Sequence, residues 1–80
     1  MVSGSQIRSA RALLGISAQE FAKLAGVGWA TIQRFEASDG IPESRGGTLE
    51  RVVAALEAEG IEFIGDPLKS PGVRLKRMGR

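Results

Sequence analysis

The side chains best suited to molecular recognition lie in residues 28–37, a stretch whose apolar spacing predicts a helix. Ile32 and Phe35 set its buried face, and at 100° per residue four other side chains then point outward: Ala30, Gln33, Arg34 and Ala37. Arginine can bond guanine through two donors, glutamine can pair with adenine, and alanine can contact a thymine methyl group. If this helix belongs to a DNA-binding motif, we expect contacts with base edges by Arg34, Gln33 and Ala30, in that order. The alternative is that these side chains are merely solvated.

The composition excludes most catalytic and metal-binding chemistry. The chain has no cysteine and no histidine, which removes disulfides, thiol nucleophiles, imidazole bases and zinc sites of the Cys/His kind. The glycines form neither a GxxxxGK[ST] nor a GxGxxG pattern. Glu57 and Glu59 lie on the solvent side of a predicted helix, where a carboxylate pair without a pocket does no acid–base work. We therefore expect neither an enzyme nor a cofactor or metal.

The length and composition predict one small globular domain. The chain has 80 residues, of which 42% are hydrophobic and 25% charged, as in ordinary folded proteins. A chain of this size buries only about 60% of the surface of its unfolded form, so association with a partner is expected. The formal net charge is only +2, and the basic excess lies in residues 61–80.

Neither a membrane span nor a secretion signal is visible. No apolar run approaches the roughly 18 residues of a membrane span, and residues 1–5 have neither the charged start nor the apolar core of a signal peptide. We therefore expect a cytoplasmic protein that does not bind membranes.

Two short helices with matching start signals are predicted before residue 28. Ser3 with Gln6, and Ser17 with Glu20, both have the spacing of a capping box, in which each residue of the pair bonds the other's backbone N–H. A glycine ends each helix, at residues 15 and 26. The short stretch Gly26-Val27-Gly28 alone connects the second helix to the predicted helix 28–37.

A loop, a fourth helix and a hairpin are predicted after residue 37. Residues 38–47 are polar and glycine-rich, and a helix follows from Thr48 with Gly60 as its C-terminal cap. From residue 61 the apolar period becomes two, which predicts a β-hairpin with four apolar residues on one face: Ile61, Phe63, Val73 and Leu75. We expect the last four residues, 77–80, to be frayed and basic.

The second and third helices are predicted to form a helix-turn-helix. In this motif two short helices are joined by a tight turn, the second lies in the DNA major groove and the first crosses the backbone. Ala22 and Ala25 supply the small residues needed where the helices approach, while Val27 and Ile32 fill the gap between them. The motif predicts binding to double-stranded DNA.

The chain resembles the lambda-repressor-like, Cro/XRE-type helix-turn-helix family over about residues 3–60. The matching segments are Ile7-Arg8-Ser9-Ala10-Arg11, Gly15-Ile16-Ser17, Phe21-Ala22, Ala25-Gly26-Val27, Ala30-Thr31-Ile32 and Phe35-Glu36. The resemblance implies a compact helical DNA-binding domain, often dimeric, that acts as a sequence-specific transcriptional regulator. It also implies that Arg11 pairs with Glu36 and holds the recognition helix against the first helix. The alternative is two independent surface charges.

Several further residues are candidates for contacts with DNA or with a protein. Arg45, Ser17 and Gln19 are candidate phosphate contacts, which position a protein without reading sequence. Trp29 has three interpretations: it completes the core, presses against DNA, or anchors a protein partner. Leu24, on the open side of the second helix, favours the last of these.

These observations predict a mainly α protein: a four-helix, lambda-repressor-like helix-turn-helix domain over residues 1–60, then a short β-hairpin and basic tail over residues 61–80. The expected function is a sequence-specific DNA-binding regulator, a repressor acting as a homodimer. Because a lone hairpin is at best marginally stable in water, a second subunit is expected to cover it. The alternative for the hairpin is that it folds back on its own domain. The alternative for the function is an interaction module, such as an antitoxin or inhibitor, that binds a partner protein.

Overall fold

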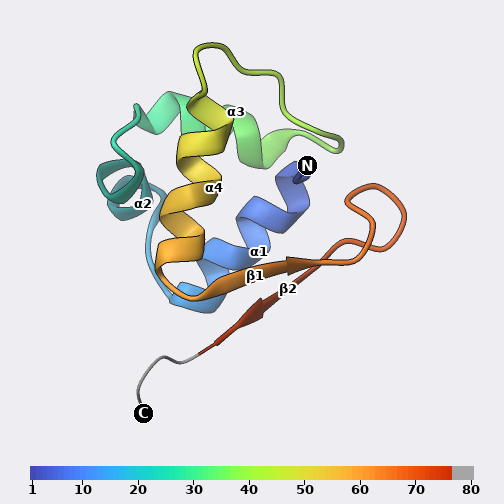
Figure 1. Cartoon of the computed structure of the whole chain (residues 1–80). Coiled ribbons are helices and arrows are strands. Elements are labelled where there is room, and N and C mark those ends of the chain that lie inside the picture. Colours follow the sequence, from blue (N-terminus) through green and yellow to red (C-terminus); the bar gives the residue numbers. More distant parts are fainter. Residues whose placement is uncertain (77–80) are drawn as a thin grey trace.

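Four helices and an antiparallel hairpin make up residues 1–76, which the computed structural model describes (Figure 1). The elements are α1 (Gly4–Leu14), α2 (Ala18–Ala25), α3 (Trp29–Ala37), α4 (Thr48–Ala58), β1 (Ile61–Ile64) and β2 (Gly72–Leu75). The predicted mainly α architecture with a C-terminal hairpin is confirmed. The frayed, basic end expected at residues 77–80 lies outside the described part of the chain.

Both predicted capping boxes are present at the starts of α1 and α2. The Gln6 backbone N–H donates to Ser3 Oγ at 3.3 Å, and the Ser3 N–H donates to Gln6 Oε1 at 3.0 Å. In α2 the corresponding distances between Ser17 and Glu20 are 3.0 and 2.8 Å. These reciprocal bonds satisfy backbone donors that the first turn of a helix leaves without a partner.

The end of α4 differs from the prediction by one residue. Glu59, not Gly60, is the C-terminal cap, and Gly60 follows it with φ of 99°. The backbone at Gly60 is therefore left-handed, a conformation that glycine adopts without steric cost, and it redirects the chain from α4 into β1.

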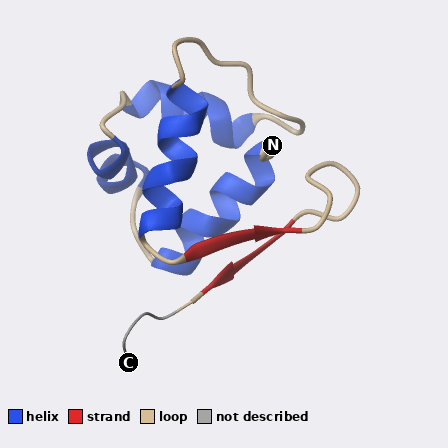
Figure 2. Ribbon diagram, viewed as in Figure 1, coloured by secondary structure: helices blue, strands red, loops and turns tan. Residues whose placement is uncertain are grey.

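The hairpin lies across α1 and α4 and completes the core (Figure 2). Ile61 is buried, and the other apolar residues of the hairpin, Phe63, Val73 and Leu75, pack against the same core. The side-chain amide of Gln6 donates to the carbonyl oxygens of Ile64 and Gly72, at 3.2 and 3.0 Å, and so fastens α1 to both strands. The protein's own helices pack against this apolar face, as in the alternative of a hairpin folded back on its own domain, and association with a second subunit stays a prediction.

The outer face of the hairpin is charged. Arg74 and Lys76 on or beside β2 form ion pairs with Glu62 on β1. Since Glu62 and Arg74 are directly opposite in the strand register, their side chains lie next to each other on the same face of the hairpin. The hairpin thus has one side for the core and one for solvent.

The largest buried side chains come from all four helices and form one hydrophobic core. They are Phe21, Phe35, Ile7, Ile32, Leu56 and Val52. Within residues 1–76, no helix is long and apolar enough to cross a membrane.

Candidate nucleic-acid interface

Helices α2 and α3 form a compact pair around a three-residue turn. Phe21, Ala22 and Ala25 of α2 are buried, as are Ile32 and Phe35 of α3. The small alanine side chains allow the two helices to pack closely, as the sequence predicted. In the turn, Val27 is partly buried and its backbone N–H donates to the Ala22 carbonyl at 3.0 Å.

The outward face of α3 is accessible in the positions predicted from its helical phase. Ala30, Gln33, Arg34 and Ala37 are all exposed, while Thr31 is half-buried. Because Ile32 and Phe35 are completely buried, the orientation of this face is determined by the core. A partner that approaches α3 from outside would meet these side chains first.

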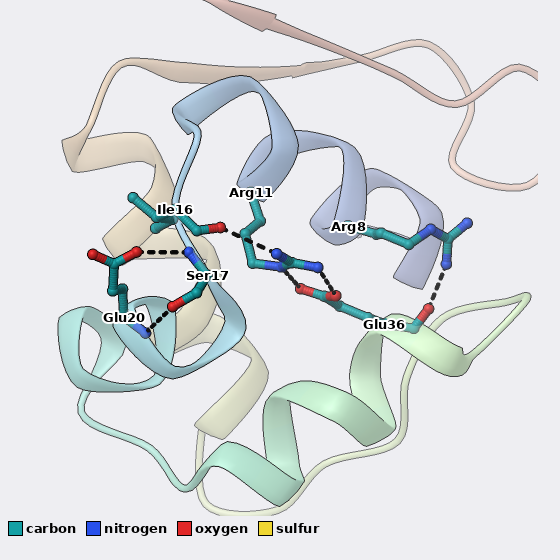
Figure 3. Close-up of polar contacts among 6 residues, drawn as sticks. All are labelled: Arg8, Arg11, Ile16, Ser17, Glu20 and Glu36. Atoms are coloured by element: carbon teal, nitrogen blue, oxygen red, sulfur yellow. Dashed lines mark hydrogen bonds and ion pairs between the residues drawn. The ribbon is translucent and has the colours of Figure 1, made fainter.

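The predicted ion pair between Arg11 and Glu36 joins α1 to the end of α3 (Figure 3). Arg11 Nε and Nη2 donate to the two carboxylate oxygens of Glu36 at 2.7 and 2.9 Å, and Arg11 Nη1 donates to the Ile16 carbonyl at 3.1 Å. The hydrogen bond to Glu36 raises the pKa of Arg11. Glu36 is only 8% exposed. The alternative of two independent surface charges is therefore wrong.

A second arginine strengthens the same junction. Arg8, one turn before Arg11 in α1, donates from Nη1 to the backbone carbonyl of Glu36 (Figure 3). Residue 36 is thus bound through both its side chain and its backbone, and α3 is held to α1 at its C-terminal end.

Arg34 and Arg45 lie around one surface depression, although Arg34 points toward the loop and not straight outward. Arg34 Nη1 donates to the Glu43 carbonyl at 2.7 Å, and Arg34 Cζ lies 5.0 Å from the centroid of the Phe35 ring. The depression has a volume of about 630 Å³ and is lined by Thr31, Arg34, Glu43, Ser44, Arg45 and Thr48. The loop therefore brings a second guanidinium group beside α3.

A second depression lies between the N-terminal ends of α2 and α3. It has a volume of about 550 Å³, and three predicted site residues line it: Ser17, Gln19 and Trp29. Lys23 also lines this depression and was not predicted. Its position four residues after Gln19 places both side chains on one face of α2, so helical spacing alone could have identified it.

Trp29 and Leu24 are the exposed apolar side chains of this region. Trp29 is 49% exposed and Leu24 is 44% exposed. The interpretation in which Trp29 completes the core is therefore wrong, while contact with DNA or with a protein stays a prediction. Leu24 is not among the residues that line the depression beside Trp29.

Comparisons with known proteins identify no relative. The chain matches no protein-family model and no curated protein. Among residues 1–76, no group of three or more His, Cys, Asp or Glu side chains is placed to hold a metal ion.

Proposed function

We propose that this protein is a sequence-specific DNA-binding regulator with a helix-turn-helix of the lambda-repressor-like type. In this proposal α3 enters the major groove and α2 lies across the DNA backbone. The observation that carries it is the exposed face of α3 on a helix that is buried on its other side and tied to α1 through Glu36. A rigidly held helix with accessible polar side chains meets the requirement for reading base edges.

The surroundings of α3 support the same proposal. Arg34 and Arg45 line one depression beside α3, and Ser17, Gln19, Lys23 and Trp29 line another. A duplex that receives α3 in its major groove would pass both groups, so cations and hydrogen-bond donors would lie near the DNA on both flanks of the helix. Gln33 and Ala30, which are exposed outside both depressions, would face the base edges.

We further propose that the protein binds as a homodimer and represses transcription. Two-fold symmetry would place two copies of α3 in half-sites about one DNA turn, or roughly 34 Å, apart. The shortest dimension of one subunit is 20 Å, so two subunits fit at this spacing when that dimension lies along the DNA.

Direct titration tests the proposed function. Binding to duplex DNA should weaken steeply as salt rises, because neutralised phosphates release counterions. Selection of bound sites from random duplex DNA should then yield a preferred sequence. Gln33→Ala should weaken binding to that sequence and leave binding to a scrambled duplex unchanged, since Gln33 is proposed to contact bases only. Absence of duplex binding at low salt would contradict the proposal.

A second candidate function is a protein-interaction module, such as an antitoxin or inhibitor. The observation that favours it is the exposure of Trp29 and Leu24, two large apolar side chains on α3 and α2. Large exposed apolar side chains can anchor a protein partner, and tryptophan is enriched in such anchors. If the chain binds no duplex DNA, this candidate becomes the preferred one.

A further inference from the structure

The depression between α3 and the following loop concentrates positive charge. Two of the six residues that line it are arginines, Arg34 and Arg45, and one is acidic, Glu43. Two hydroxyl groups in the lining are already bonded within the protein: Ser44 Oγ accepts from the Leu49 N–H at 3.2 Å, and Thr48 Oγ1 donates to the Arg45 carbonyl at 2.7 Å. The cationic donors that a ligand would meet are therefore the two arginines, with Thr31 beside them.

Arg34 is held in position before any ligand binds. The Glu43 carbonyl accepts from Nη1, and the guanidinium lies near the ring of Phe35, so two contacts restrict a side chain that would otherwise be free. Among the hydrogen bonds of residues 1–76, Arg34 uses only Nη1, which leaves Nε and Nη2 to donate to a ligand. A side chain fixed in this way loses less conformational entropy on binding.

We propose that this depression binds a phosphate of the DNA backbone through Arg34 and Arg45, so that Arg34 is a phosphate contact and not the main base reader. The inference rests on the proposed function. A guanidinium group matches the oxygens of a phosphate with two parallel donors, and two such groups favour an anion over a neutral base edge. The hydrogen bond to the Glu43 carbonyl turns Arg34 toward the loop that carries Arg45, a different direction from that predicted by helical phase alone.

The Glu43 carboxylate is expected to oppose this binding. Glu43 is one of the residues that line the depression, and its negative charge has the same sign as the charge of a phosphate. The contact that positions Arg34 uses the backbone carbonyl of Glu43, which a side-chain substitution leaves in place. Glu43→Gln therefore removes the repulsion and keeps the position of Arg34.

The test measures affinity and its salt dependence for five variants on the preferred and on a scrambled duplex. Arg34→Ala and Arg45→Ala should each weaken binding to both duplexes by the same factor, about ten-fold, and each should lower the slope of log affinity against log salt by about one. Glu43→Gln should tighten binding to both duplexes, a gain that damaged folding cannot produce. Glu57→Gln, in a different depression with Val2 and Val53, is the matched control and should change nothing. Gln33→Ala supplies the base-reading comparison.

The outcomes separate this inference from the proposed function. If Arg34→Ala weakens only the preferred duplex and leaves the salt slope unchanged, Arg34 reads a base and the inference is wrong, while the proposed function stands. If Glu43→Gln leaves affinity unchanged, the depression does not lie on the DNA backbone. If the unsubstituted chain binds neither duplex, both proposals are overturned.

Discussion

The Arg11–Glu36 pair fixes α3 through side chains on two different helices. Three donors of Arg11 have protein acceptors, and Glu36 is nearly buried, so both charges are compensated inside the fold. Such a pair adds little net stability compared with apolar residues, but removal of one partner leaves the other charge without compensation. The pair therefore serves mainly to orient the helix that carries Gln33.

Glu36→Gln should lower the free energy of unfolding by about 1–3 kcal/mol, because it leaves the half-buried Arg11 without its counter-charge. Glu57→Gln, an exposed carboxylate on α4, should change it by less than about 0.5 kcal/mol. Urea midpoints of the two variants give the comparison. Equal midpoints would show that the pair contributes nothing to the fold.

Side-chain contacts with short sequence spacing could be predicted, whereas contacts with distant backbone could not. Ser17 and Glu20 are three residues apart, and their spacing alone predicted a capping box. The direction of Arg34 depends on a backbone carbonyl nine residues away, and any residue type at position 43 carries such a carbonyl. Helical phase therefore gave the exposure of Arg34 but not its direction.

At the scale of elements, α1 meets the end of α3 without space for a side chain. A Cβ atom at Gly4 would overlap the carbonyl oxygens of Phe35 and Ser38, and the Gly4 N–H donates to the Gly40 carbonyl at 3.0 Å. Because backbone atoms line both sides, the overlap cannot be relieved by a side-chain rotation. This close approach sets the position of α3 relative to α1.

Gly4→Ala should destabilise the protein by about 1–3 kcal/mol, the range typical of overpacking. Gly28→Ala is the control at the start of α3, since a Cβ there would lie 4.0 Å from Thr31 Oγ1 and the backbone is not left-handed. Thermal unfolding of the two variants compares them. A Gly4→Ala variant as stable as the unsubstituted chain would mean that α1 and α3 can move apart at little cost.

The capping box of α2 should make stability depend on pH. The Ser17 backbone N–H donates to the Glu20 carboxylate and lowers the pKa of Glu20 in the folded protein. A lowered pKa contributes stability above the unfolded-state pKa of about 4.3, and that contribution is lost as pH falls through the folded-state pKa. Glu20→Gln can still form the capping box but does not titrate.

Unfolding by urea at pH 7 and pH 3 should therefore show a smaller loss of stability at pH 3 for Glu20→Gln than for the unsubstituted chain. Glu62, whose pKa is lowered by its hydrogen bond to Arg74, should preserve part of the pH dependence. Glu59→Gln, which changes a carboxylate outside the capping box, serves as control. The same pH dependence in all three proteins would contradict the role of Glu20.

Periodicity predicted which elements form but not how the hairpin joins the helices. Alternation of apolar residues gave the two strands and their inward side chains, and Gly60 correctly marked the change from helix to strand. The attachment depends on Gln6, whose side chain completes the capping box and also bonds the hairpin. Nothing in its sequence spacing reveals the second role, because the strands lie about 60 residues further along the chain.

At the scale of the whole molecule, the hairpin is part of the domain and not a separate arm. Truncation after Gly60 would remove the buried Ile61 and expose the core that Phe63, Val73 and Leu75 cover. Such a truncation tests folding more than association. A second subunit must therefore be sought at a surface that the fold leaves open.

The outer edge of β2 is such a surface. Within residues 1–76 no other strand pairs with this edge. The Lys76 N–H donates to the Gly60 carbonyl, so these two opposite residues form a hydrogen-bonded pair. Hydrogen-bonded and non-bonded pairs alternate along an antiparallel ladder. In the strand register, Val73 and Leu75 therefore belong to non-bonded pairs, and their backbone N–H and C=O groups point to the open edge. A second copy could pair there, strand to strand, and form a four-stranded sheet across a two-fold axis.

Val73→Pro should convert the dimer to a monomer while the helical circular dichroism is kept. Proline at this position removes an N–H from the open edge and none from the ladder with β1, and edge strands tolerate proline. Sedimentation equilibrium gives the mass. Leu49→Glu, on the partly exposed side of α4, tests the rival contact. If Val73→Pro is still a dimer and Leu49→Glu is a monomer, the interface lies on α4 and not on the hairpin. If the unsubstituted chain is already a monomer, the proposed homodimer is wrong.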